Sequence, residues 1–179
     1  MILVLTGPVH GGKTSFLERS LARWTGRGLA CGGFLSIAAA DAKGAKSYDL
    51  LELQTGRRHP FLRCEGGPGA ERSGPFFFVP ETLDLARRII RTAGPGGLLI
   101  VDEVGPLELR GGGLWPALQE TVGRPGGNIL LVVREEILED VTAALAPVVP
   151  LVFDVRAPGV RELLERSLLG PGEFDEDQS

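Results

Sequence analysis

Short apolar runs alternate along this chain with segments in which apolar residues recur at helical spacing. Near-continuous apolar runs are typical of parallel strands, because helices cover such a sheet on both faces. The runs that predict strands of this kind are Ile2–Leu5, Leu98–Val101, Ile129–Val133 and Pro150–Val155. Helices are predicted from Thr14 to about Arg23, Glu81 to about Thr92, about Glu135 to Ala146 and Gly159 to Leu169. The pattern predicts a three-layer α/β fold with a mostly parallel sheet.

The region 31–79 has a different pattern. Here turn residues and glycine-rich stretches, rather than helical segments, separate the apolar runs. Strands are predicted at Leu29–Ser36, Tyr48–Leu53, Pro60–Cys64 and Phe76–Val79, and a loop of small residues from Ala38 to Lys46. We interpret the region as a β-rich insertion in the parallel fold.

Length and composition are compatible with a single domain. The chain has 179 residues, of which 43% are hydrophobic, and this is enough to bury one core. We expect the domain to span residues 1–169. Residues 170–179 are predicted to form a flexible acidic tail, since they include Glu173, Asp175, Glu176 and Asp177.

Charge and hydropathy narrow the choice of partners. The formal net charge of −4 provides no general attraction for nucleic acid or for an anionic membrane. The chain contains no apolar run long enough to span a bilayer, and its start lacks the charged segment and apolar stretch of a signal peptide. We therefore expect a cytoplasmic protein with no nucleic-acid or membrane partner, while a protein partner stays open.

The two cysteines add little chemistry. Cys31 and Cys64 lack the Cys and His companions that a zinc site needs. Reduced thiols are the expected state, and a disulfide between them is the alternative.

The clearest chemical signal directly follows the first predicted strand. Its spacing, G-x-x-x-x-G-K-[ST], lets successive backbone N–H groups point into one concavity, where the Lys13 ammonium reaches the β- and γ-phosphates of a nucleotide and the Thr14 hydroxyl ligates Mg²⁺. The helix that begins here directs its positive dipole end at the same anion. The predicted phosphate loop consists of Gly7, Pro8, Val9, His10, Gly11, Gly12, Lys13, Thr14 and Ser15. A nucleoside triphosphate such as ATP or GTP is therefore the expected ligand.

Two carboxylates follow the second important apolar run. Leu98–Val101 leads directly into Asp102 and Glu103, as in a buried strand that delivers a carboxylate at its carboxyl end. Beside a phosphate loop, such an aspartate holds Mg²⁺ and the following glutamate orients and deprotonates the attacking water. We assign Asp102 and Thr14 to the metal and Glu103 to the general base. Ligands of parallel sheets bind beyond the carboxyl ends of the strands, where the loop, these carboxylates and Arg134 are all expected.

Several other residues have a plainer interpretation. His10 occupies a variable loop position, so we favour a spacer over a catalytic imidazole. The aromatic residues Trp24, Trp115 and Phe76–Phe78 could stack on a base, but core positions are favoured. For the arginines Arg57, Arg58 and Arg63, a solvated hairpin face is favoured over contact with an acidic substrate or a phosphate tail.

The motifs together resemble a known family, the small phosphate-loop nucleoside-triphosphatases found in thermophiles and, as the cancer-related nucleoside-triphosphatase, in animals. The resemblance rests on Gly7–Ser15, on Gly33 and Phe34, on Ser47–Leu51 and above all on Asp102–Leu109. The last block is similar to the family signature D-E-[IV]-G-x-[ML]-E-L. The resemblance covers nearly the whole chain and weakens after the last predicted strand.

The resemblance implies a nucleoside-triphosphate phosphohydrolase that needs Mg²⁺, tolerates different bases and has a RecA-like sheet with a β-hairpin insertion. Arg134 matches a position where family members carry a polar or basic residue, which makes it a catalytic candidate that senses the γ-phosphate; a surface arginine is the alternative. Glu108 is expected to anchor the loop that follows the carboxylates. In place of the Glu-Val-Arg expected after Gly-Phe, this chain has Ser36, Ile37 and Ala38.

Two other functions remain open at this point. In a small-metabolite or nucleoside kinase, the β-rich insertion would bind an acceptor hydroxyl, and Glu103 would serve that hydroxyl instead of water. In a nucleotide-dependent switch, the protein would bind a partner and hydrolyse slowly. Fold and motif determine how phosphate is handled, but leave the acceptor pocket free to vary.

Overall fold

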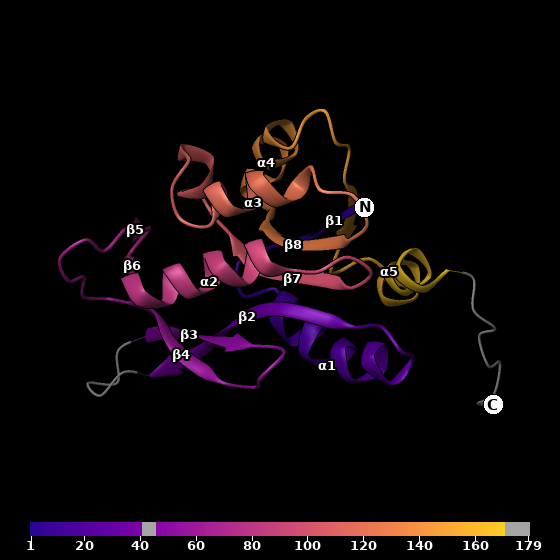
Figure 1. Ribbon diagram of the computed structural model, residues 1–179, viewed down its shortest axis with the longest axis horizontal. Coiled ribbons are helices and arrows are strands. Elements are labelled where there is room, and N and C mark those ends of the chain that lie inside the picture. Colours follow the sequence, from indigo (N-terminus) through magenta and orange to yellow (C-terminus); the bar gives the residue numbers. More distant parts are fainter. Residues whose placement is uncertain (41–45, 171–179) are drawn as a thin grey trace.

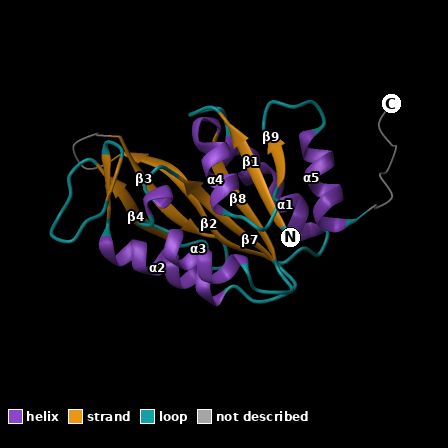
Figure 2. Ribbon diagram, turned by 90° about the horizontal axis from the view of Figure 1, so that it is seen from above, coloured by secondary structure: helices purple, strands orange, loops and turns teal. Residues whose placement is uncertain are grey.

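The computed structural model describes residues 1–40 and 46–170, which form one twisted sheet with helices on both faces (Figures 1 and 2). Strand order in this nine-stranded sheet is β5-β6-β4-β3-β2-β7-β8-β1-β9. The strands are β1 (Ile2–Gly7), β2 (Cys31–Ala40), β3 (Lys46–Glu52), β4 (Arg58–Arg63), β5 (Arg72–Ser73), β6 (Phe76–Phe78), β7 (Leu98–Val104), β8 (Asn128–Arg134) and β9 (Leu151–Asp154). The helices are α1 (Lys13–Gly26), α2 (Pro80–Thr92), α3 (Trp115–Val122), α4 (Leu138–Ala144) and α5 (Val160–Leu169), with short 3₁₀ turns η1 (Glu108–Arg110) and η2 (Glu135–Ile137).

One half of the sheet is parallel, as the apolar runs predict. Strands β2, β7, β8, β1 and β9 lie side by side in this half, and all four of these pairings are parallel. All six residues of β1 are buried, since the neighbouring strands and both helical layers surround it. The α/β fold class is confirmed, and the carboxyl ends of these strands meet at one edge.

The other half is antiparallel and forms an extension of the sheet. Strand β2 pairs with β3, followed by β4, β6 and β5, every pairing being antiparallel. The loop predicted from Ala38 to Lys46 is wrong at its ends: Ala38 pairs with Tyr48 and Ala39 with Ser47, and β3 begins at Lys46. The partner strand here outweighs the low strand propensity of alanine. The rest of that predicted loop, 41–45, lies outside the described residues.

The buried apolar residues form two clusters, one on each face of the sheet, between the strands and the helices. On one face, residues of α2, α3 and α4 pack with Val4, Val101 and Leu131; on the other, Phe16 and Trp24 of α1 pack with Leu3. Figure 1 shows α2 and α3 above strand β2, and α1 below it. Trp24 and Trp115 are buried core residues, as favoured from the sequence.

The helical predictions hold except in two places. Helix α3 was not predicted, because its eight residues, with Pro116 in the first turn, are too few for a clear apolar period. The helix predicted from about Glu135 to Ala146 is divided into η2 and the shorter α4. Of the predicted acidic tail, residues 171–179 lie outside the part of the chain that the structure describes.

A glycine allows strands β2 and β7 to lie close together. Gly33 of β2 has φ of +97°, and a Cβ atom there would lie 2.0 Å from the carbonyl oxygen of Ile100. Only glycine is compatible with both the left-handed backbone and the close approach. Phe34, the next residue, pairs with Val101 directly before Asp102, so this contact supports the strand that carries the carboxylates.

The described residues include both cysteines and all five α-helices. Cys31 and Cys64 are free thiols, as expected. Among the helices of residues 1–40 and 46–170, none is long and apolar enough to cross a membrane.

Candidate functional site

The predicted phosphate loop connects β1 to α1 at the carboxyl edge of the parallel strands. His10 has φ of +61° and Gly12 of +83°, and the Gly11 N–H donates to the Pro8 carbonyl at 2.9 Å. Alternation of left-handed and right-handed residues turns successive N–H groups toward one side, which makes a concavity for an anion. The loop therefore has the backbone conformation that the spacing predicts.

Lys13 holds the two ends of the loop together. Its ammonium donates to the carbonyl oxygens of Gly7 and Pro8, both at 2.9 Å, and its side chain is buried. An ammonium has three N–H donors, so one remains for a phosphate oxygen. Gly7 and Pro8 thus support Lys13, while the predicted loop residues that line the cavity are Val9, His10, Gly11, Gly12, Lys13, Thr14 and Ser15.

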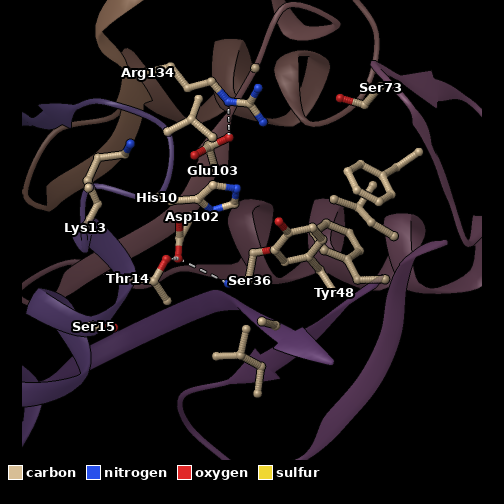
Figure 3. Close-up of a pocket in the computed structure, with 18 of the residues that line it drawn as sticks. His10, Lys13, Thr14, Ser15, Ser36, Tyr48, Ser73, Asp102, Glu103 and Arg134 are labelled. Atoms are coloured by element: carbon tan, nitrogen blue, oxygen red, sulfur yellow. Dashed lines mark hydrogen bonds and ion pairs between the residues drawn. The ribbon is translucent and has the colours of Figure 1, made fainter. Parts of the chain in front are cut away.

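Thr14 and Asp102 meet at the floor of the site, although 88 positions separate them. The Thr14 hydroxyl donates to Asp102 Oδ2 at 2.8 Å, and the Ser36 backbone N–H donates to the same oxygen at 3.2 Å. Asp102 is only 1% exposed, and this burial raises its pKa to about 7 against the opposing effect of the Thr14 hydrogen bond. Figure 3 shows the three residues together.

This pair fits a divalent cation. Mg²⁺ prefers hard oxygen ligands, and the usual protein contribution is one or two side chains while phosphates and water complete the shell. A hydroxyl and a carboxylate 2.8 Å apart provide such ligands. The buried Asp102 carboxylate also lacks a close cationic side chain among the hydrogen bonds and ion pairs of the described residues, and a bound cation would supply the opposite charge.

Glu103 and Arg134 lie together one strand apart. Glu103 Oε1 is 2.5 Å from Arg134 Nε, and both side chains are partly exposed to the same cavity (Figure 3). Strand β7 carries the glutamate and β8 the arginine, so adjacent parallel strands deliver the pair. The arginine therefore lines the same cavity as the glutamate, and its role as a sensor of the γ-phosphate stays a prediction.

The segment after the carboxylates is fastened by Glu108. This buried carboxylate accepts hydrogen bonds from the backbone N–H groups of Gly105, at 2.8 Å, and Leu114, at 3.1 Å. Burial raises the pKa of Glu108, and these two N–H groups oppose that shift. Glu108 is the loop anchor that the resemblance implied.

Sequence reasoning missed a contact at the mouth of the phosphate loop. The Lys46 ammonium lies 2.9 Å from His10 Nε2. Because an ammonium can only donate, the imidazole nitrogen accepts, and His10 serves to hold Lys46 beside the loop. The motif contains no sign of this contact, since β3 brings Lys46 from 36 positions away.

The cavity that these residues line has a volume of about 490 Å³ and continues beyond the loop into the antiparallel half of the sheet. Of the arginines left as solvated, Arg58 lines it, whereas Arg63 is paired with Asp49 at 2.6 Å. Tyr48 and Phe76 line it as well, with ring centroids 5.3 Å apart. The two rings were not expected to face the site, because the register of β3 and β6 determines where they point.

The chain is similar to known proteins in sequence and in fold. A family described as NTPase matches residues 2–157. Nucleoside-triphosphatase THEP1 of Hyperthermus butylicus is 27% identical over 148 residues, which cover 81% of this chain and 78% of that protein.

Two solved structures share the fold. The solution structure of a human cancer-related nucleoside triphosphatase matches with a TM-score of 0.67 and 25% identity, covering 93% of this chain and 94% of that one. The crystal structure of THEP1 from Aquifex aeolicus matches with the same TM-score and 16% identity, covering 94% and 97%, and shows the fold alone. With the family match over most of its length, this chain belongs to the NTPase family.

Proposed function

We propose that this protein hydrolyses nucleoside triphosphates to the diphosphate and phosphate, that it needs Mg²⁺ and that it accepts different bases. The observation that carries the proposal is the meeting of four groups in one cavity: the phosphate loop, the Thr14–Asp102 pair, Glu103 and Arg134. Family membership and the names of the relatives support the reaction class.

The loop and Lys13 would bind the triphosphate. Backbone N–H groups at the start of α1 and the remaining N–H of Lys13 donate to phosphate oxygens, whose charge grows as the γ-phosphoryl group leaves. These groups are fixed before the nucleotide arrives, because the carbonyls of Gly7 and Pro8 already hold the ammonium. Fixed donors cost no reorganisation in the transition state.

Thr14 and Asp102 would hold the metal. When bound there, Mg²⁺ neutralises charge on the β- and γ-phosphates. The backbone N–H of Ser36 in β2 donates to the Asp102 carboxylate and keeps it in place. This chain has Ser36, Ile37 and Ala38 where Glu-Val-Arg is expected, but the contact does not depend on the side chain at position 36.

Glu103 would activate the water. Its carboxylate takes a proton from the water while the water oxygen bonds to the γ-phosphorus, and the bond to the β-phosphate oxygen breaks with its electron pair on the diphosphate. Arg134 pairs with this carboxylate at 2.5 Å, and its remaining N–H groups would donate to a γ-phosphate oxygen. This gives the arginine two tasks, positioning and charge stabilisation.

We expect different bases to be accepted because the loop binds the phosphates of the nucleotide and not its base. The loop donors face phosphates, which ATP, GTP, CTP and UTP have in common. Selection among bases needs polar groups matched to each base edge, and the motif contains none.

Phosphate release from the four nucleotides, with and without Mg²⁺, tests the proposal. We expect steady turnover of several nucleotides, loss of turnover without Mg²⁺, and at least about 100-fold slower release by Lys13→Ala and Asp102→Asn. Arg88→Gln, an exposed change on α2, is the matched control and should behave as the wild type. Tight nucleotide binding without phosphate release by the wild type would contradict hydrolysis as the activity.

A further inference from the structure

The cavity has a wall that hydrolysis does not use. Beyond Glu103 it is lined by Tyr48 of β3, Arg58 and Phe61 of β4, Ser73 of β5 and Phe76 of β6. Water has no apolar surface to bury, and none of these side chains is needed to bind a phosphate or to activate water. The wall therefore has no part in phosphate binding or in water activation.

The chemistry of the wall is that of a site for a flat molecule. Phe61 is buried at its base, while Tyr48 and Phe76 are half-buried and meet edge to face, 5.3 Å apart and at 89°. Aromatic rings that line a cavity in this way offer faces and edges for a planar heterocycle. Small-molecule sites combine such apolar walls with a few polar groups that fix orientation.

The wall contains polar side chains that have no partner among the described residues, and two of them belong to Arg58 and Tyr48. Within residues 1–40 and 46–170, neither the Arg58 guanidinium nor the Tyr48 hydroxyl has a hydrogen-bond or ion-pair partner. The neighbouring Arg63, by contrast, bonds to Asp49 and to the Tyr48 carbonyl. Arg58 can therefore donate to a carbonyl or ring nitrogen of a bound heterocycle.

The position of the wall shows which ligand it would take. In phosphoryl transfer the nucleophile and the leaving oxygen lie on opposite sides of the γ-phosphorus. Lys13 and Tyr48 lie on opposite sides of Asp102 and Glu103 in Figure 3. Glu103 must face the nucleophile in order to remove its proton, so the wall lies on the nucleophile's side, whereas the base and sugar of the triphosphate belong to the leaving side.

We infer that this wall is the binding site for a second substrate, a nucleoside, whose hydroxyl accepts the γ-phosphoryl group in place of water. The inference rests on the proposed function, because it uses the same loop, metal ligands and Glu103. The acceptor oxygen bonds to the γ-phosphorus, its proton goes to the Glu103 carboxylate, and the bond to the β-phosphate oxygen breaks to release the diphosphate. The acceptor is a hydroxyl because the Glu103 carboxylate removes a proton, and a hydroxyl carries that proton on the oxygen that attacks.

The test is a transfer assay with γ-³²P-labelled ATP, Mg²⁺ and, as probes, adenosine, guanosine, cytidine, uridine or thymidine. Label in the nucleoside is separated from label in inorganic phosphate. We expect at least one nucleoside to become labelled at the expense of phosphate. Tyr48→Leu and Arg58→Gln should each lower the labelling rate at low nucleoside concentration by roughly 5- to 150-fold, the range of one stacked base or one lost contact. Arg57→Gln, one residue away and outside the cavity, is the matched control and should keep wild-type labelling.

The outcomes separate the two proposals. Phosphate release with no labelled nucleoside up to millimolar concentrations overturns the second site and leaves hydrolysis standing. Labelling of nucleoside 5′-monophosphates in place of nucleosides overturns the assignment of a hydroxyl acceptor. If Tyr48→Leu instead weakens ATP binding when nucleoside is absent, the wall holds the base of the triphosphate and the inference is wrong. Absence of both products from the wild type means that the proposed function itself fails.

Discussion

The Glu103 carboxylate lies 2.5 Å from the Arg134 guanidinium and thereby joins the carboxyl ends of strands β7 and β8. A single polar residue at the end of a strand has no particular functional meaning. As a pair that lines the same cavity as Lys13 and Thr14, they form the part of the site that would act on the nucleophile.

The pairing predicts that the effects of the two residues on catalysis are not additive. Arg134→Gln should slow single-turnover phosphate release at least about tenfold. The Glu103 carboxylate would lose the partner that positions it, and the γ-phosphate would lose a hydrogen-bond donor. The double variant with Glu103→Gln should be little slower than Glu103→Gln alone, since residues that act as a unit lose their effect together. Fully additive losses in this cycle would mean that the two side chains work separately.

The anchor residue predicts a stability effect without direct chemistry. Glu108→Ala leaves the N–H groups of Gly105 and Leu114 without their acceptor, and we expect the free energy of unfolding to fall by about 2–4 kcal/mol. Urea denaturation measures this. Glu18→Ala, at an exposed position of α1, is the matched control and should change stability by less than about 0.5 kcal/mol. Equal effects of the two changes would remove the anchoring role.

The close approach at Gly33 predicts intolerance of a single methyl group. Gly33→Ala places a Cβ atom 2.0 Å from the Ile100 carbonyl oxygen in a left-handed conformation, and we expect unfolding free energy to fall by about 2–4 kcal/mol. Gly67→Ala meets no atom within 4 Å and should stay within about 1 kcal/mol of the wild type. Wild-type stability of Gly33→Ala would show that β2 and β7 are less tightly joined.

The two thiols should differ in reactivity. Partial burial raises the pKa of Cys31 to about 11, so little of this thiol is ionised at pH 8. Cys64 is exposed. Iodoacetamide at pH 8, followed by peptide mass spectrometry, should modify Cys64 first and the partly buried Cys31 more slowly, with a faster reaction of Cys31 at higher pH. Modification of Cys31 at the same rate would contradict its burial.

Much of the parallel half was predictable because its signals are local. A continuous apolar run such as Ile2–Leu5 fits a strand that helices cover on both faces of the sheet. The spacing of the phosphate loop determines the backbone conformation of the few residues that it includes. Asp102 and Glu103 could be placed at the site because carboxyl ends of parallel strands share an edge. The meeting of Thr14 with Asp102 follows from that rule.

The antiparallel half was predicted less well, because its contacts depend on strand order and register. Ala38 continues β2 through pairing with Tyr48, and the two-residue β5 has no periodic signal. Side chains that enter the cavity from this half, Arg58 and Phe76 among them, come to it through register alone. The contact of His10 with Lys46 could not be predicted either, because no sequence motif relates these two positions.

The most direct test of the account compares Glu103→Gln with the wild type in two measurements on the same protein: affinity for MgATP, and the single-turnover rate of γ-phosphate release. Glu135→Gln, a carboxylate beside Arg134 on the outer surface, is the matched control. Because the base acts only in the transition state, we predict affinity within about threefold of the wild type and release slower by about 10²- to 10⁴-fold. An unchanged rate, or equal losses of affinity and rate, would contradict the assignment of Glu103 as the group that activates the nucleophile.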